Sequence, residues 1–298
     1  SLGINNIPAK VCTYACVYCQ VGRTTRMVVE REQFYEPQAI VREADERLRE
    51  AGSRSERVDY LTFVPDGEAT LDINLGREIG MLKGLGVPIG VITNSTLLWC
   101  EDVREELASA DWVSLKVDSL RDEVWRKINR PHKGLALHSI LEGMRSFARA
   151  FAGKLVTETM LVEGVNDSES GLQEVADFIR SLHPSRAYLS VPTRPPAMEW
   201  VRPVCEETLA RAHEIFAAGL EQVEYLVDYE GDAFVSTGDV SSDLLSIASV
   251  HPMRAEAVEA LLKRAGASWD IVEQLVQRGD LKNVSFGGHL YYLRRFIK

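Results

Sequence analysis

Three of the five cysteines in this 298-residue chain fall within eight residues, as Cys12, Cys16 and Cys19. Thiolates bind soft metals and iron–sulfur clusters, and this spacing lets one short loop surround a single site. Cys100 and Cys205 stand alone, and no histidine lies close by in sequence to complete a Cys3His zinc site. The residues leave three interpretations open: a three-thiolate [4Fe–4S] cluster, a zinc site, or three structural thiols. In the first, one iron lacks a protein ligand, which implies an external ligand and therefore chemistry.

Further polar side chains follow two of the predicted strands. Asp66, Gly67 and Glu68 come after a β-branched run, and Asn94 comes after the next one. A glycine there lets the backbone approach a ligand, and a carboxylate accepts hydrogen bonds from an ammonium group. The alternatives are that Asp66-Gly67-Glu68 is an ordinary acidic turn and that Asn94 only caps the segment that follows it.

Polar residues also alternate along the strand predicted at 112–117. Ser114, Lys116 and Asp118 stand two residues apart, so we expect all three on one face. On an otherwise buried strand this pattern indicates a lined cavity. The alternative is an ion pair between Lys116 and Asp118 inside a barrel.

The next strand and a later loop add weaker candidates for substrate binding. Thr157 and Thr159 share one face of the strand and Glu158 the other, so only one set lines the cavity. Arg194 precedes two prolines on a stiff loop, where it is either an anion contact or a surface arginine. The candidate substrate contacts are Asp66, Arg194 and Thr159.

Strand-like and helical stretches alternate along the chain to about residue 227. Apolar spacing predicts helices at 36–51, 75–85, 102–108, 135–151, 171–182 and 206–217, and strands at 2–5, 58–64, 89–93, 112–117, 155–161, 188–191 and 223–227. Single helices between strands predict an α/β fold with a parallel sheet. About six repeats fit a partial (β/α)6 TIM-type barrel, and a doubly wound sheet is the alternative. In both folds the functional loops follow the carboxyl ends of the strands.

The pattern changes beyond residue 230. Residues 241–298 predict three short helices and a hairpin around Gly287-Gly288, which together resemble a winged-helix unit. We therefore expect two domains, 1–235 and 241–298, joined by a loop that includes Gly231-Asp232 and 236–238. The second domain carries 8 Lys and Arg against 6 Asp and Glu, so the net charge of −10 divides into +2 there and −12 on residues 1–240. Such a unit serves either as a nucleic-acid grip or as a lid or protein platform, and this charge leaves nucleic-acid binding open only to it.

Composition excludes several classes of protein. Hydrophobic residues make up 45% and charged residues 26% of the chain, which are ordinary globular values rather than those of a disordered segment. No apolar run approaches the length of a membrane helix, and no secretory leader is present, so we expect a cytoplasmic protein with no membrane partner. Because the chain begins at Ser1 without Met, we expect residues to be missing before it.

The cysteine spacing, with Tyr18 directly before the third cysteine, resembles the signature of the radical S-adenosylmethionine (SAM) superfamily. The resemblance extends over residues 1–230 or so. The segments 1–5, 62–68, 116–118 and 192–196 resemble a narrower group, the wyosine-synthase-like Fe–S oxidoreductases. Enzymes of that group that modify tRNA carry further cysteines for a second cluster, which Cys100 and Cys205 cannot form. The chain therefore resembles a single-cluster member.

This resemblance implies that Cys12, Cys16 and Cys19 hold a [4Fe–4S] cluster whose open iron binds SAM. Reductive cleavage of SAM then gives a 5′-deoxyadenosyl radical, which abstracts hydrogen from an unidentified RNA base, peptide or small metabolite. Gly67-Glu68 matches the superfamily's motif for the SAM amino group, although Ala69 replaces the usual proline. The implied cofactor contacts are Gly67, Glu68, Tyr18, Asn94, Ser114, Lys116, Asp118 and Val165.

The resemblance also implies a protein reductant such as flavodoxin or ferredoxin. A rival hypothesis is a metal- or cluster-containing regulator that binds nucleic acid through the winged helix. The metal content separates the two, because one zinc ion and no sulfide would favour the regulator. A simple Fe–S electron carrier, the third hypothesis, would not bind SAM.

Overall fold

A computed structural model describes residues 1–226, 239–250 and 252–295. The chain forms two compact units. The first comprises Ser1–Cys16, Thr24–Val191 and Pro203–Leu226, and the second comprises Val17–Arg23, Pro192–Arg202 and Val227–Lys298. Two segments of the predicted first domain, 17–23 and 192–202, are thus grouped with the C-terminal residues, and the first of them carries Cys19. The predicted connecting loop, with Gly231-Asp232 and 236–238, lies outside the described residues.

The first unit is built on a seven-stranded parallel sheet. Its strands, in spatial order, are β1 (Leu2–Ile4), β4 (Leu61–Phe63), β5 (Ile89–Thr93), β6 (Trp112–Lys116), β7 (Lys154–Met160), β8 (Arg186–Ser190) and β9 (Val223–Leu226). Each strand pairs in parallel with the next. Because this order never reverses, right-handed connections carry every crossover helix to the same face. This topology excludes the doubly wound alternative and confirms the partial TIM-type barrel.

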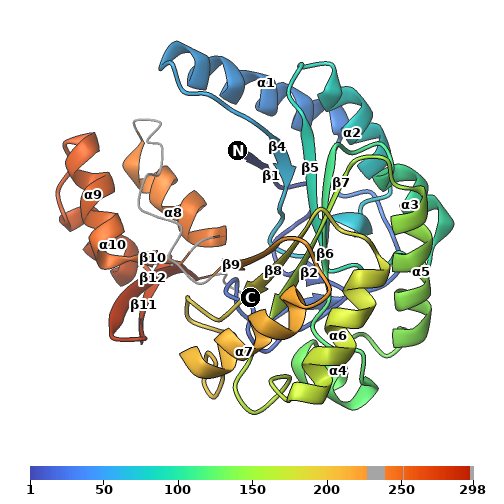
Figure 1. Ribbon diagram of the computed structural model, residues 1–298. Helices are drawn as coiled ribbons and strands as arrows, with labels where there is room; N and C mark the ends of the chain where they lie inside the picture. The colour runs from blue at the N-terminus through green and yellow to red at the C-terminus, as the bar shows by residue number, and fades with distance from the viewer. Residues whose placement is uncertain (227–238, 251, 296–298) are drawn as a thin grey trace. The chain divides into compact units, whose positions relative to one another are not determined.

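Amphipathic helices cover the outer face of this sheet (Figure 1). They are α1 (Pro37–Ser53), α2 (Leu75–Lys83), α3 (Glu101–Leu107), α5 (Leu137–Ala150), α6 (Glu169–Ser181) and α7 (Glu206–Ala217). In α6, Leu172, Val175 and Ile179 recur at helical spacing and are buried, and the Ser168 side chain caps the helix by accepting from the Gly171 amide. Four shorter elements were not expected from periodicity: β2 (Val11–Cys12), β3 (Arg26–Met27), the 3-10 helix η1 (Ala69–Leu71) and α4 (Asp122–Ile128).

The two faces of the sheet differ in character. On the helix-covered face, Phe63, Val91 and Leu115 are completely buried. On the other face, Ile92, Ser114 and Val156 align across β5, β6 and β7. Lys116 and Glu158 lie two residues further along β6 and β7 and align with each other on the same face. The register places polar side chains on this second face, which we call the open face. Ile92 is 38% exposed there.

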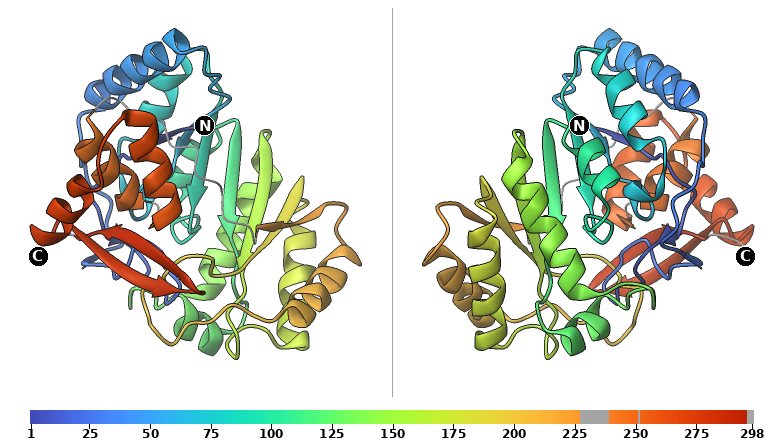
Figure 2. Two further views of the ribbon diagram at one scale, coloured as in Figure 1. Left: turned by 90° about the vertical axis from the view of Figure 1, so that its left-hand side faces the viewer. Right: turned by 90° about the vertical axis from the view of Figure 1, so that its right-hand side faces the viewer.

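The second unit contains helices α8 (Val240–Val250), α9 (Ala255–Ala265) and α10 (Asp270–Gln277) with the short strand β10 (Met253–Arg254). A hairpin of β11 (Leu281–Phe286) and β12 (His289–Arg294) completes an antiparallel sheet in the order β10-β12-β11 (Figure 2). Gly287 and Gly288 both have positive φ, as the hairpin turn requires. The three predicted helices and the hairpin are present, and their assignment as a winged helix stays a prediction.

Candidate functional site

Strand β2, which ends at Cys12, and the loop that follows it carry the cysteine motif. None of the five cysteines forms a disulfide within the described residues, and Cys12, Cys16 and Cys19 are half-buried. A segment after α4 holds the start of this loop through backbone pairing: the His132 amide donates to the Thr13 carbonyl at 2.9 Å, and the Ala15 amide to the Asn129 carbonyl at 3.1 Å. The loop before Cys16 is therefore held in place by a segment more than one hundred residues away in sequence.

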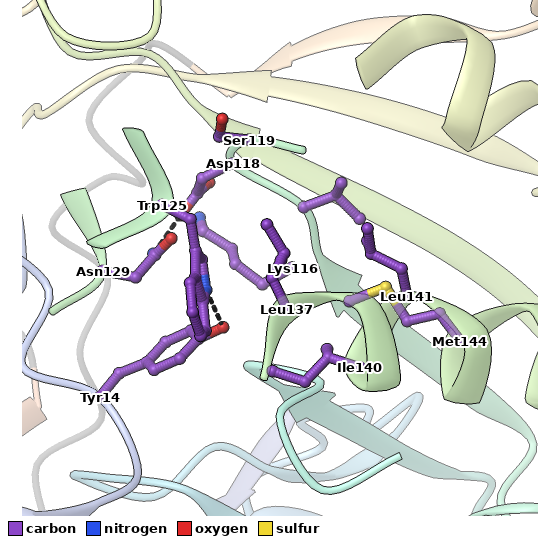
Figure 3. Close-up of a pocket in the computed structure, with 11 residues that line it drawn as sticks. Tyr14, Lys116, Asp118, Ser119, Trp125, Asn129, Leu137, Ile140, Leu141 and Met144 are labelled. Carbon is purple, nitrogen blue, oxygen red and sulfur yellow. Dashed lines mark hydrogen bonds between the residues drawn. The ribbon is translucent and has the colours of Figure 1, made fainter. Parts of the chain in front are cut away.

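An aromatic pair anchors the loop more deeply. The Trp125 indole of α4 donates to the Tyr14 hydroxyl at 2.6 Å, and the two rings meet edge to face with centroids 6.1 Å apart (Figure 3). Burial raises the pKa of Tyr14 well above its ordinary value, so the phenol stays neutral. A neutral, apolar anchor holds the chain between the first two cysteines.

Two asparagine side chains donate to the thiol sulfurs. The Asn94 amide nitrogen lies 3.5 Å from Cys12 Sγ, and the Asn129 amide nitrogen lies 3.5 Å from Cys16 Sγ. The backbone amide of Tyr14 also donates to Cys12 Sγ at 3.5 Å. Donors of this kind stabilise negative charge on sulfur, which suits these cysteines to act as thiolate ligands.

The described residues hold no group of three or more His, Cys, Asp or Glu side chains close enough together to bind a metal ion. The fit of the motif to a [4Fe–4S] cluster therefore rests on the donor set. Three half-buried thiols that form no disulfide lie within eight residues, and amide donors reach the sulfurs of Cys12 and Cys16. Soft sulfur donors of this kind suit an iron–sulfur cluster.

Glu68 is buried and joins the ends of two neighbouring strands. Its carboxylate accepts from the Thr70 amide and hydroxyl, from the Thr93 hydroxyl at 2.6 Å and from the Asn94 amide at 2.7 Å. Burial raises the pKa of Glu68, and these donors partly offset that shift. The sequence suggested a carboxylate that receives the SAM ammonium group, but the structure shows one occupied mainly in fixing the loops after β4 and β5.

Position 67 requires glycine because of a close contact within the protein, and not because of the expected contact with a ligand. A Cβ atom there would lie 1.8 Å from the Val11 carbonyl oxygen, and the Glu68 amide donates to that oxygen at 3.2 Å. The close approach is thus to the chain next to Cys12, whereas we expected an approach to a ligand. Asp66 is buried, and its carbonyl accepts from the Lys10 amide at 2.8 Å.

Lys116 and Glu158 form an ion pair of 2.7 Å on the open face. Ser190 donates to the same carboxylate oxygen at 2.8 Å. Burial acts to raise the pKa of Glu158, but the Lys116 charge more than offsets this effect, so the pKa of Glu158 is lowered overall. Burial acts to lower the pKa of Lys116, but the nearby carboxylates outweigh it, so the pKa of Lys116 is raised. Lys116 therefore pairs with Glu158 on the next strand, whereas the alternative considered from the sequence was an ion pair with Asp118. Ser114 shares this face.

Thr159 belongs to the opposite face. It aligns with buried Leu189, is 1% exposed, and its hydroxyl donates to the Val117 carbonyl at 2.8 Å. The expectation that Thr159 contacts substrate does not fit this placement. Of the two sets left open by the sequence, Glu158 is the one that reaches the open face.

Asp118 is held by the end of α4 and the end of β7. One carboxylate oxygen accepts from the Asn129 side chain at 2.7 Å and the other from the Met160 amide at 2.9 Å. Its carbonyl accepts from Asn166, which is itself buried beside Val165 in the turn after β7. The Val165 amide donates to the Val162 carbonyl at 3.1 Å within this turn. Asp118 and Val165 thus belong to one connected network.

The remaining candidates lie in the second unit. Arg194 is only 7% exposed and donates to the Gln20 side chain at 2.8 Å, so it is not a surface arginine. Gln20 directly follows Cys19, and Tyr18 precedes it, both half-exposed. In the same unit, the Tyr291 hydroxyl donates to the Thr193 carbonyl at 2.9 Å. The loop that carries Arg194 is thus held by both β12 and the segment around Cys19.

Sequence reasoning missed two functional candidates, Asn129 and Asn166, and named Glu158 only as one of two alternatives. Asn166 directly follows Val165, which the family resemblance had indicated as a cofactor contact. Asn129 gave a weaker signal, because α4 is too short for a clear periodicity.

Comparison with known proteins places this geometry in a family. The model of the radical SAM superfamily matches residues 6–191, more than half of the chain, so the protein belongs to the radical SAM superfamily. Members of this superfamily bind a [4Fe–4S] cluster and SAM and need a reductant, and the chain is accordingly a radical SAM enzyme. Within the superfamily, the chain is 43% identical over 296 residues to UPF0026 protein MJ1312 of Methanocaldococcus jannaschii. The matched region covers 99% of this chain and 92% of that protein.

Solved structures with little sequence identity share the fold. A radical SAM methyltransferase from Sphaerobacter thermophilus has a TM-score of 0.60 at 16% identity, over 78% of this chain and 67% of that chain. SuiB of Streptococcus suis, bound to SAM, has a TM-score of 0.55 at 13% identity, over 76% of this chain and 50% of that chain. Within the described residues, no helix is both long and apolar enough to cross a membrane.

Proposed function

We propose that the protein cleaves SAM reductively at one [4Fe–4S] cluster and uses the resulting radical to abstract hydrogen from a substrate. One observation carries this proposal most directly. The Cys12–Cys19 loop carries three thiols that form no disulfide, and Asn94 and Asn129 direct amide donors at two of the sulfurs. Such donors stabilise negative charge on sulfur and so suit these thiols to be thiolate ligands.

In this proposal Cys12, Cys16 and Cys19 are the three protein ligands of the cluster. A [4Fe–4S] cluster held there by three cysteines would keep one iron available to SAM and would supply the electron for its reductive cleavage. The chain's own contribution is to fix the thiols. Trp125 and Asn129 hold the loop through Tyr14, Ala15 and Cys16.

The residues around the loop divide into positioning and binding groups. Glu68 and Gly67 position the site, since they lock the loops after β4 and β5 against Val11. On the open face, Lys116 and Ser114 would bind the charged and hydroxyl groups of SAM, with the charge of Lys116 maintained by Glu158.

The other predicted contacts are assigned more generally. Asp118 and the backbone around Val165 belong to one hydrogen-bonded network after β6 and β7, where a nucleoside would lie in a barrel of this type. Tyr18 is suited to pack against SAM. Asp66 and Arg194 are buried, and as substrate contacts they stay predictions beside the polar side chains of the open face.

The direct test is SAM cleavage under anaerobic conditions. Protein reconstituted with iron and sulfide, then given dithionite and SAM, should release 5′-deoxyadenosine and methionine in equal amounts. If protein that holds about four irons per chain binds SAM but releases no 5′-deoxyadenosine, the proposal fails. Protein that contains one zinc ion and no sulfide would contradict it as well.

The reductant would be an electron carrier such as flavodoxin or ferredoxin. Five cysteines that form no disulfide suit a reducing compartment, which favours the cytoplasm. Exchange of dithionite for reduced flavodoxin in the same assay should retain 5′-deoxyadenosine formation.

Nucleic-acid binding through the second unit receives little support. The first turn of α10, which would enter the groove of a duplex in a winged helix, exposes Asp270 and Glu273. These carboxylates would repel phosphate groups. A role as a lid or protein platform suits this surface better, and substrate trials should begin with peptides and small metabolites.

A further inference from the structure

Asn129 connects two parts of the site that the sequence treats separately. Its side-chain nitrogen lies 3.5 Å from Cys16 Sγ and 2.7 Å from an Asp118 carboxylate oxygen. An asparagine side chain has two N–H groups, so one amide can serve the thiol and the carboxylate together. Figure 3 shows Asn129 directed toward Asp118 beside the Tyr14–Trp125 pair.

The position of Asn129 is fixed independently of these contacts. It ends α4, with its amide donating to the Trp125 carbonyl at 2.8 Å. Its carbonyl accepts from the amide of Ala15, the residue before Cys16. The side chain is only 2% exposed, so water does not compete effectively for its N–H groups.

We propose that Asn129 is a positioning residue that sets the reduction potential of the cluster through its hydrogen bond to Cys16. This inference rests on the proposed function, because it takes Cys16 to be a cluster ligand. A donor to cysteine sulfur favours the reduced state of an iron–sulfur cluster, since that state carries one more negative charge. The same amide also separates the Asp118 carboxylate from the Cys16 thiolate, two negative charges that would otherwise repel.

Asn94 makes the parallel contact with Cys12 but differs in its other partners. The side-chain amide of Asn94 also donates to the Thr13 hydroxyl at 2.8 Å, which is a neutral group. The side-chain amide of Asn129 instead donates to the Asp118 carboxylate. Loss of Asn129 therefore removes a donor and exposes the thiolate to a nearby negative charge, so its effect on the potential should exceed that of losing Asn94.

The test compares reconstituted holoenzymes by redox titration monitored by electron paramagnetic resonance. Asn129→Leu removes both N–H groups at similar volume. We expect its midpoint potential to fall, so that at a fixed potential near the wild-type midpoint the ratio of reduced to oxidised cluster drops about tenfold, which is ~59 mV for one electron. Asn6→Leu is the matched control: Asn6 is also a fully buried asparagine, but it donates to Ala69 and Glu78 and should leave the potential unchanged.

A second variant preserves the net charge and the hydrogen bond between positions 118 and 129. The exchange Asp118→Asn with Asn129→Asp keeps both but places the carboxylate, rather than the amide, beside Cys16. It should lower the potential at least as far as Asn129→Leu. Wild-type midpoints in both variants, with about four irons per chain retained, would overturn the proposal.

The wild-type holoenzyme gives a reading that requires no variant. With ¹⁵N-labelled asparagine, hyperfine spectroscopy of the reduced cluster should detect nitrogen coupling through the hydrogen bonds to sulfur, and its absence would also overturn the proposal. Failure of the proposed function is distinguishable, because it would appear as absent 5′-deoxyadenosine in the wild type. Failure of this inference alone would leave SAM cleavage intact and the potentials equal.

Discussion

The two faces of the seven-stranded sheet are built from the same strands yet serve different purposes. The helix-covered face contributes Phe63, Val91 and Leu115, each completely buried, to the main core. The open face carries Ser114 and the ion pair of Lys116 with Glu158. One residue of shift along a strand separates a side chain that stabilises the fold from one that is available for chemistry.

This difference teaches how to interpret polar residues near the site. Glu68 is as polar as Glu158, but it is 1% exposed and tied to β5 by hydrogen bonds, whereas Glu158 is partly exposed beside Lys116. The first is expected to affect folding and site geometry together. The second is expected to affect ligand binding with little effect on folding once its partner is also removed.

The largest effect on stability should come from the covered face. Phe63→Ala leaves a cavity in the core and should reduce the free energy of unfolding by about 3–5 kcal/mol. Ile92→Ala, on the open face and 38% exposed, should cost less than about 1 kcal/mol. Urea unfolding monitored by circular dichroism measures both. Equal losses would show that the two faces are not distinct.

Removal of the open-face ion pair should show the reverse pattern. The side chains of Lys116 and Glu158 are 14% and 23% exposed, and replacement of such a largely buried pair by neutral side chains is often close to neutral, so Lys116→Met with Glu158→Gln should change the free energy of unfolding by less than about 2 kcal/mol. SAM affinity, measured by calorimetry on the holoenzyme, should weaken at least about tenfold. Wild-type affinity in this double variant would assign the pair a structural role only.

A smaller effect should appear in the pH dependence of stability. Burial and the neighbouring Asp72 raise the pKa of Glu78 to about 8, and Asn6 donates to its carboxylate at 3.3 Å. Because the folded state then binds this proton more tightly than the unfolded state, the contribution of Glu78 is present below the ordinary Glu pKa and is lost as pH rises toward 8.

The variant Glu78→Gln should therefore show a weaker decline in the free energy of unfolding between pH 5 and pH 8 than the wild type. Urea titrations at several pH values measure this slope. Asp72, whose pKa is raised to about 6, should retain part of the decline. An unchanged slope in the variant would show that Glu78 is ionised throughout this range in the folded protein.

Much of the fold follows from the sequence, because long apolar periodicities survive in every context. The strand at 89–93 and the helix at 206–217 agree with β5 and α7 at both ends. Shorter elements gave no such signal. The seven residues of α4 contain only Trp125 and Ile128 as buried positions, so the helix that carries Asn129 at its end was not expected.

The site was less predictable than the fold because residues of the same type have different roles, depending on their contacts in the folded protein. Cysteine spacing is local, and it drew attention to the loop directly. The choice between Glu158 and Thr159 depended on which face the helices cover, which alternation alone does not determine. Glu68 accepts hydrogen bonds from Thr93 and Asn94. These contacts depend on the pairing of β4 with β5 and on the loops after the two strands.

The central claim is that the Cys12–Cys19 loop holds the cluster that cleaves SAM. Anaerobic release of 5′-deoxyadenosine tests it most directly when Cys16→Ser is compared with Cys100→Ser, which alters an isolated cysteine. The account predicts that Cys100→Ser retains iron, sulfide and 5′-deoxyadenosine formation, while Cys16→Ser loses all three to a large degree. Wild-type iron content and wild-type 5′-deoxyadenosine release from Cys16→Ser would contradict it.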